Sequence, residues 1–280
     1  MTYHLLLLLL YCLVQLATSL TLSSSVLSIK LKNIPISSYL TPNKRNLLIF
    51  STYAADFNAI EYTQRLRHYL PELKLKSVDV TVIMNASPTQ INKHCDLLAL
   101  DQAQDGVTYL SDPCGEAGRS FDVCRGFRPD DNELNPYIKL YLMLFGLGGS
   151  MTLPSVITGY LGNPWRASPW ITTALVQGAA AGRFPGSAVD GTKNNFDDLP
   201  VVGSWGRRPL ELATLRLMNM GGVSFGNWRD LIPDKEQLEA GVLTQLGGCV
   251  LLDESGEVMY EFKDKGICHV CKFEDILEKL

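Results

Sequence analysis

The stretch NLLIF at positions 46–50 is a short apolar run of the kind that forms a buried strand. The β-branched stretch VDVTVIM at 78–84 predicts a second strand, and VTYL at 107–110 predicts a third. Between the first two, apolar residues recur at near-helical spacing from Ile60 to Leu70, and we expect Pro71 to end that helix. Another helix should begin at the cap-like sequence SPTQ (87–90) and turn Ile91 and Cys95 inward.

The C-terminal end predicts a hairpin and a closing helix. The runs GCVLL (248–252) and VMYEF (258–262) predict two strands, and the turn DESG between them has a late glycine, which is a hairpin signal. Residues 273–280 predict a helix with one apolar face. Alternating strands and helices followed by a hairpin imply parallel right-handed crossovers with an antiparallel edge pair.

Composition indicates a folded protein and excludes some functions. Of the 280 residues, 46% are hydrophobic and 19% charged, which is the profile of a globular chain rather than a disordered one. The formal net charge is only -4 and no basic run stands out, so we expect no nucleic-acid partner.

The order of these elements is that of the thioredoxin fold. The sequence GVTYLSD (106–112), with an expected short helix over 115–124 and then Gly126 and Phe127, resembles a segment of AhpC/TSA-type peroxiredoxins. The sequences QLGG (245–248), DESGEV (253–258) and KG (265–266) resemble the end of the peroxiredoxin-like 2 group. The resemblance covers about 45–130 and 240–280. It implies an α/β thioredoxin-like fold, with a central mixed sheet flanked by helices, and a redox or antioxidant function.

The loop after the first strand departs from this family pattern. In a catalytic member it carries the attacking cysteine at a helix start, where the helix N-terminus favours the thiolate. Here the loop reads YAADFN (53–58), which puts Ala55 and Asn58 where a Cys-x-x-Cys pair would lie. The resemblance therefore implies a subgroup without the usual peroxidatic activity. We expect Asp56 to cap the helix with support from Asn58, and Asp56, Phe57 and Asn58 are the candidate binding residues.

A Cys-x-x-Cys pair does occur elsewhere, at Cys268 and Cys271. The spacing suits a redox pair or half of a zinc site, but a second such pair is missing, so we expect no metal and no cofactor. One hypothesis is a thiol-dependent antioxidant protein that acts through these cysteines, with a thioredoxin-type reductant as its partner. The other is a non-catalytic thioredoxin-fold module that binds a protein partner or small ligand through the degenerate cleft and the insertion. In that case the two thiols are packed or face solvent and have no catalytic role.

The region at about 128–244 is too long for an ordinary connection and is interpreted as a mainly helical insertion. Helices are expected at 137–145, 154–161 and 210–220, the last with Leu212, Leu215 and Met218 inward, and GLGGS (146–150) as a helix breaker. The loop NPWRASPW (163–170) carries two tryptophans, which suggests a lid over the degenerate loop or a docking surface. An elaboration that only extends the core is an equal alternative.

The N-terminus has the pattern of a targeting sequence. A leucine run at 5–10, too short for a comfortable membrane span, and the sequence ATS at 17–19 predict a signal peptide over 1–19; a membrane anchor is the alternative. Residues 20–44 are rich in serine and basic residues and contain no Asp or Glu, as in a transit peptide or a disordered segment. Together they resemble the two-part plastid-targeting sequence of algae, which predicts a chloroplast location. The alternative is secretion or retention in the endoplasmic reticulum. The folded domain would then span 45–280, without stable membrane insertion of the mature chain.

Overall fold

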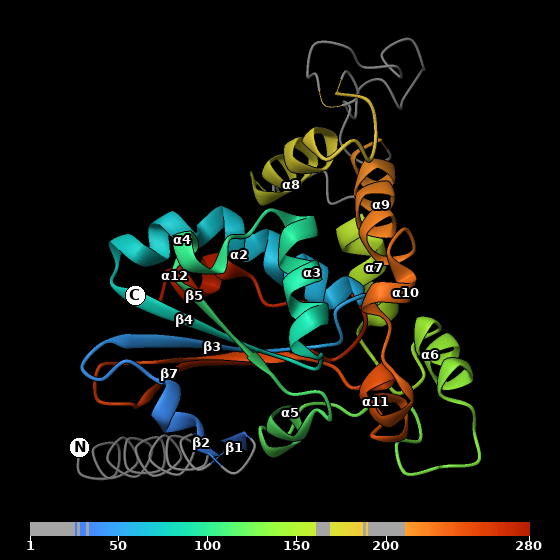
Figure 1. The fold of residues 1–280 in the computed structure, drawn as a ribbon, viewed down its shortest axis with the longest axis horizontal. Coiled ribbons are helices and arrows are strands. Elements are labelled where there is room, and N and C mark those ends of the chain that lie inside the picture. The colour runs from blue at the N-terminus through green and yellow to red at the C-terminus, as the bar shows by residue number, and fades with distance from the viewer. Residues whose placement is uncertain (1–25, 27–28, 32–33, 161–168, 187–188, 190–210) are drawn as a thin grey trace, which may run out of the picture.

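A five-stranded mixed sheet lies at the centre of the fold (Figure 1). The strands are β3 (Arg45–Ser51), β4 (Val78–Met84), β5 (Val107–Ser111), β6 (Gly248–Leu252) and β7 (Val258–Lys263), in the order β5-β4-β3-β6-β7. β3, β4 and β5 are parallel, whereas β6 runs antiparallel to β3 and β7 antiparallel to β6. All five strands predicted from the sequence are confirmed, and the chain has a mixed α/β fold. The computed structural model describes the chain except for residues 1–25, 27–28, 32–33, 161–168, 187–188 and 190–210.

The central strand β3 is buried on both faces. Its side chains alternate across the sheet. Leu47 and Ile49 therefore belong to one hydrophobic cluster, and Leu48 and Phe50 to the cluster on the opposite face. An unbroken apolar run, rather than an alternating one, is what a strand covered on both faces requires.

Helices cover the first face: α2 (Phe57–Leu75), α3 (Pro88–Leu98), α4 (Gln102–Asp105) and α12 (Phe273–Leu277). α3 starts as predicted, because Ser87 and Gln90 form a reciprocal capping box. The expected end of α2 at Pro71 was wrong, since the helix continues to Leu75. A proline there removes one backbone hydrogen bond, but Leu73 on the same turn is fully buried and holds the last turns against the core.

The second face is covered by α5 (Glu116–Ser120), β1 (Lys30–Leu31), β2 (Ile34–Pro35) and the 3₁₀ turn η1 (Ile36–Tyr39). Phe121 stacks on Phe50 with ring centroids 4.3 Å apart, and Val26 and Ile36 are buried beside them. The packed structure therefore begins before residue 45, the boundary expected from composition. The predicted signal peptide lies outside the described residues, and α5 is shorter than the helix expected over 115–124.

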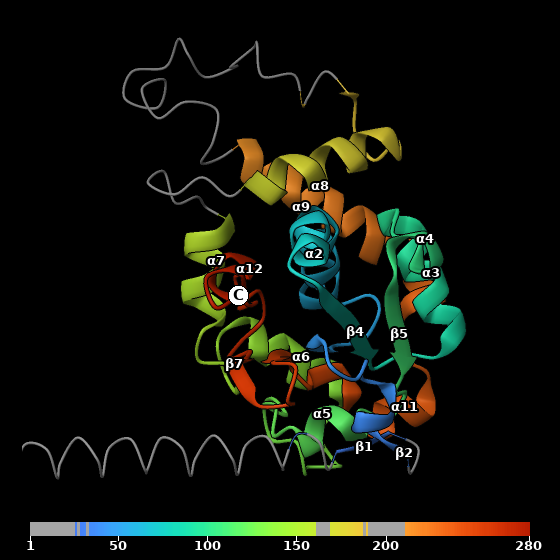
Figure 2. The same cartoon turned by 90° about the vertical axis from the view of Figure 1, so that its left-hand side faces the viewer.

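The insertion is mainly helical, as predicted, and gathers at one end of the sheet (Figures 1 and 2). Its elements are α6 (Pro136–Leu144), α7 (Thr152–Tyr160), α8 (Pro169–Ala180), α9 (Glu211–Ser224), α10 (Trp228–Leu231), α11 (Lys235–Glu239) and the 3₁₀ turn η4 (Val242–Thr244). The sequence did not predict α8, which lies across α2 (Figure 2). Of the loop expected over 163–170, residues 163–168 lie outside the described residues, and the rest begins α8.

Two details of the insertion bear on the sequence predictions. Gly146 and Gly148 adopt left-handed backbone angles (φ +88° and +73°), which confirms the helix break after α6. Leu215 is buried as expected, but Met218 is exposed. The side chain of Leu212 is not among those that the structure describes. Among the helices of the described residues, none is both long and apolar enough to cross a bilayer.

Candidate functional site

The start of α2, where the family pattern places the reactive cysteine, is closed to solvent. The chain turns after β3 through a hydrogen bond from the Asp56 N–H to the Tyr53 carbonyl (2.9 Å). Ala55 is 1% exposed and Asn58 is fully buried. The two positions of the expected Cys-x-x-Cys pair are therefore inside the protein rather than at its surface.

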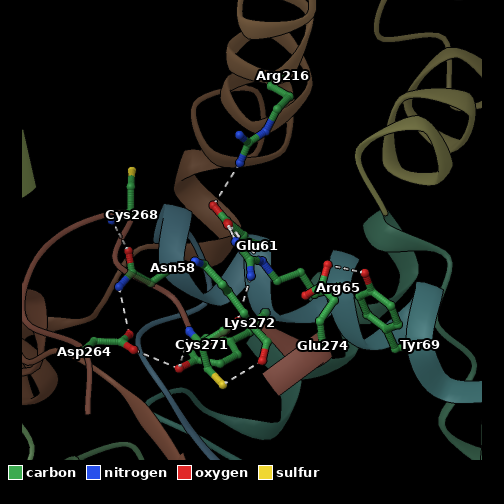
Figure 3. A network of polar contacts seen from close by, with 11 residues as sticks. Asn58, Glu61, Arg65, Tyr69, Arg216, Asp264, Cys268, Cys271, Lys272 and Glu274 are labelled. Carbon is green, nitrogen blue, oxygen red and sulfur yellow. Dashed lines mark hydrogen bonds and ion pairs between the residues drawn. The ribbon is translucent and has the colours of Figure 1, made fainter. Parts of the chain in front are cut away.

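Asn58 fixes the start of α2 to the loop that joins β7 to α12. Its Nδ2 donates to Asp264 Oδ2 (2.9 Å) and to the Gly266 carbonyl (3.3 Å), and its Oδ1 accepts from the backbone N–H of Cys268 (2.6 Å) (Figure 3). Both the amide nitrogen and the amide oxygen of Asn58 are therefore hydrogen-bonded. The residue predicted to bind a ligand thus bonds other parts of the same chain.

Asp56 occupies the N-cap position of α2, as predicted, although its carboxyl makes no well-formed capping hydrogen bond. The carboxyl still lies close enough to the backbone of Phe57 and Asn58 for these groups to lower its pKa against the effect of burial. Burial raises the pKa of the Asp56 carboxyl to about 6. The neighbouring Phe57 is half-buried, and its ring meets Phe225 of the insertion edge-on at 6.1 Å.

A second buried carboxyl, Asp264, lies in the same cluster. Its Oδ1 accepts from the Tyr62 hydroxyl (2.8 Å), and that hydroxyl in turn accepts from the Cys271 N–H (3.4 Å). Burial raises the pKa of Asp264 to about 7. The folded protein therefore holds this carboxyl largely protonated below neutral pH.

The two cysteines of the Cys-x-x-Cys sequence have different surroundings. Cys268 is half-buried, has a left-handed backbone (φ +64°), and its thiol points away from the polar network (Figure 3). Cys271 is fully buried, with its sulfur 3.5 Å from the Tyr260 hydroxyl and 3.4 Å from the Lys272 carbonyl. No cysteine in the described part of the chain forms a disulfide. The sequence spacing brings these residues to one loop without directing the thiols at each other.

A charged cluster next to this loop joins α2 to the insertion. Glu61 accepts from Arg65 Nε (2.9 Å) and from Arg216 Nη2 of α9 (3.0 Å), and Arg65 also donates to the Cys271 carbonyl (2.8 Å) (Figure 3). Trp170 of α8 stacks against both guanidinium groups, each 4.8 Å from its ring centroid. Sequence reasoning missed this cluster, whose only signal was an arginine between inward positions of the predicted helix at 210–220.

His94 of α3 holds the loop from the other side. Its Nδ1 lies 2.7 Å from the Ala54 carbonyl, which can only accept, so Nδ1 carries the proton. Nε2 then accepts from the Thr63 hydroxyl at 2.9 Å. Burial lowers the pKa of His94 to about 4, so the ring is neutral at physiological pH. This residue was also missed, because a lone histidine carries no local signal.

A groove opens away from this loop, between α8, the end of α3 and α2. Its volume is about 820 Å³, and none of residues 53–58 lines it. Leu97 and Val176 contribute apolar surface, and Arg67 and Arg183 contribute charge. Arg183 is itself held by Gln177 (3.0 Å) and by other polar groups on α3 and α9.

In the described part of the chain, no three His, Cys, Asp or Glu side chains gather in a way that could hold a metal ion. The chain matches no family model, no curated protein and no solved structure.

Proposed function

We propose that the chain is a non-catalytic binding module with a thioredoxin-like fold. The sheet order supports this fold, because three parallel strands are followed by an antiparallel hairpin and α2 leaves the end of the central strand. In this proposal the start of α2 is a structural joint, by which we mean a buried contact point that connects the core, the loop before α12 and the insertion.

The burial and bonding of Asn58 carry the proposal. Thiol-based peroxide reduction needs a thiolate that peroxide can reach. The two positions that would supply it hold Ala55, which has no reactive group, and Asn58, whose amide is fully engaged with Asp264, Gly266 and Cys268. Converting such a site into a joint removes the reaction and stabilises the contact with the loop before α12.

Binding in this proposal uses the groove along α8 rather than the closed loop. A volume of about 820 Å³ falls within the range of small-molecule sites, roughly 300–1,000 Å³. Val176 on its wall is exposed, so Val176→Trp would fill the groove without disturbing the core. In a thermal-shift screen of small organic molecules, we expect hits that this variant loses and that Leu75→Trp, at an exposed site on α2, keeps. A screen without groove-dependent hits would count against the binding role.

The second candidate is a thiol-dependent antioxidant function through Cys268. One observation favours it: Cys268 is half-buried, and its backbone N–H is hydrogen-bonded to Asn58, so this residue lies beside a position that a cysteine of the resembled family would occupy. A thioredoxin-type reductant would then be the partner. Cys271 is less suited to reaction, because its sulfur is buried between Tyr260 and the backbone.

Peroxide consumption separates the two functions. The full chain would be assayed with thioredoxin, its reductase and NADPH, alongside Cys268→Ser, Cys271→Ser and the matched control Cys114→Ser. We expect no turnover above buffer for any of them. Turnover that Cys268→Ser or Cys271→Ser abolishes and Cys114→Ser keeps would replace the binding module with the antioxidant function.

We also propose that the chain is delivered through a signal peptide, to the plastid or along the secretory route. Packing of Val26 and Ile36 against Phe50 supports a mature chain that keeps residues 26–44. Removing them would expose apolar surface on the second face of the sheet. A fluorescent protein fused after residue 44 tests the destination, and sequencing the mature N-terminus, expected before Val26, tests the boundary.

A further inference from the structure

Helix α6 turns its apolar side chains outward. Lys139, the only charged residue in the helix, is 7% exposed and donates to the Asp131 carbonyl. Five large apolar side chains at helical spacing are instead exposed on one face: Tyr137, Ile138, Tyr141, Leu144 and Phe145. A surface helix normally has the reverse arrangement.

The exposed face continues into the next helix. Leu147 in the turn is exposed, as are Leu153 and Ile157, one turn apart on α7. Leu153 Cδ1 lies 4.0 Å from the place that a Cβ on Gly146 would take, so α7 meets the end of α6 there. We call these eight side chains on α6, the turn and α7 the apolar stripe. Figure 1 shows α6 at the edge of the fold, and Figure 2 shows α7 at an outer edge.

The apolar stripe is larger than a monomer usually exposes. Eight large side chains, each about half exposed, present roughly 800 Å² if each offers about 200 Å² in full. The largest apolar patch on a typical monomer covers about 300–600 Å². A standard protein interface buries about 800 Å² on each partner. The stripe therefore has the area that a stable contact needs.

Opposite charges lie at the two ends of the stripe. Exposed Glu133 precedes α6, and Asp130 and Asp131 before it pair with Arg125 and Arg128 (2.8 and 2.9 Å). Exposed Lys265 lies beside the start of α7, where its carbonyl accepts from the Met151 N–H (2.9 Å). Between these ends, residues 134–189 contain no Asp or Glu at all.

We propose that the apolar stripe pairs with a second copy of this chain across a two-fold axis, with the two α6 helices antiparallel. This arrangement brings Glu133 of one copy towards the partner's Lys265. An uncharged centre rich in Tyr and Phe with a charged rim is the usual anatomy of such an interface. A lipid surface fits less well, because interfacial helices have Lys or Arg around the apolar face, whereas the only charged residue on α6 and α7 is the buried Lys139.

Light scattering on the eluting full chain measures the association. We expect a dimer at about 50 µM, and a monomer for Ile138→Glu combined with Tyr141→Glu. Both sites are exposed, so the fold should tolerate the changes, which circular dichroism checks. Leu75→Glu, at the exposed end of α2, should remain a dimer. Lys265→Glu should weaken the dimer about fivefold, and adding Glu133→Lys should restore it.

Three results would overturn the proposal. The first is a wild-type chain that is monomeric at about 100 µM. The second is a dimer that the double glutamate variant leaves intact. The third is a monomer that cosediments with phosphatidylcholine vesicles and loses this binding in the double variant, which would identify a lipid surface as the occupant. None of these results depends on the groove or on peroxide turnover, so this proposal and the proposed function can fail separately.

Discussion

Asn58→Ala should destabilise the protein far more than an ordinary polar truncation. The change removes three hydrogen bonds, to Asp264, Gly266 and Cys268, in a fully buried place. Each such bond contributes about 1 kcal/mol, and each buried group left without a partner costs about 1–3 kcal/mol. Asp264 keeps Tyr62, and the Gly266 carbonyl keeps the His269 N–H (3.2 Å), so the group left unsatisfied is chiefly the Cys268 N–H. We expect a loss of about 4 kcal/mol in the free energy of unfolding.

Urea denaturation followed by circular dichroism measures this loss, with Asn92→Ala as the matched control. Asn92 is an exposed asparagine on α3, and its truncation should change the free energy of unfolding by less than about 0.5 kcal/mol. A loss below about 1 kcal/mol for Asn58→Ala would refute the view that this side chain fastens α2 to the loop before α12.

Two further predictions concern the buried charges. Burial raises the pKa of Asp264 from 3.8 to about 7, so the folded state keeps a proton that the unfolded chain releases; the contribution of Asp264 to stability should therefore fall as the pH rises from about 4 to about 7, by up to about 4 kcal/mol. Buried His94 acts in the opposite direction over much of this range, because its pKa is lowered from 6.5 to about 4. Asp264→Asn should remove the contribution of Asp264, which appears as the difference between the variant and the wild type in denaturation curves taken across that pH range. Glu278→Gln at an exposed site should leave the curves unchanged. Glu61→Ala removes the carboxylate that both Arg65 and Arg216 contact, and it should cost about 3–5 kcal/mol and speed proteolysis within α8 and α9. Equal effects from Glu72→Ala, at an exposed site on the same helix, would contradict this role.

The sheet could be predicted because each of its strands is a continuous apolar or β-branched run. The end of α2 could not, since Pro71 signals a stop and only the buried Leu73 shows why the helix continues. The inward face of α9 was predicted from apolar residues alone, whereas Arg216 and Asn219 on that face are buried. Both are satisfied by groups far away in the sequence: Arg216 pairs with Glu61, and Asn219 donates to a carbonyl on α8.

In the candidate site too, local features could be predicted from the sequence, whereas contacts between residues far apart in the sequence could not. The sequence correctly marked 53–58 as a segment without a thiol, of which residues 57 and 58 already belong to α2, and it marked Asn58 as a residue of interest. It could not reveal that Asn58 bonds Asp264, which lies 206 positions later. Nor could the spacing of Cys268 and Cys271 indicate that one thiol points out of the network and the other is buried. The Ser-rich composition of 20–44 likewise concealed the apolar residues that pack on the sheet.

The central claim is that the start of α2 is a closed joint rather than a reactive cleft. Its most direct test is native-state alkylation of the Ala55→Cys variant, with the label at each position quantified by peptide mass spectrometry. Cys268, half-buried in the same molecule, is the internal reference. Because Ala55 is 1% exposed, we predict that the introduced thiol reacts at least about a hundredfold more slowly than Cys268 until the protein is unfolded. A thiol at position 55 that reacts as fast as Cys268 in the folded protein would contradict the account.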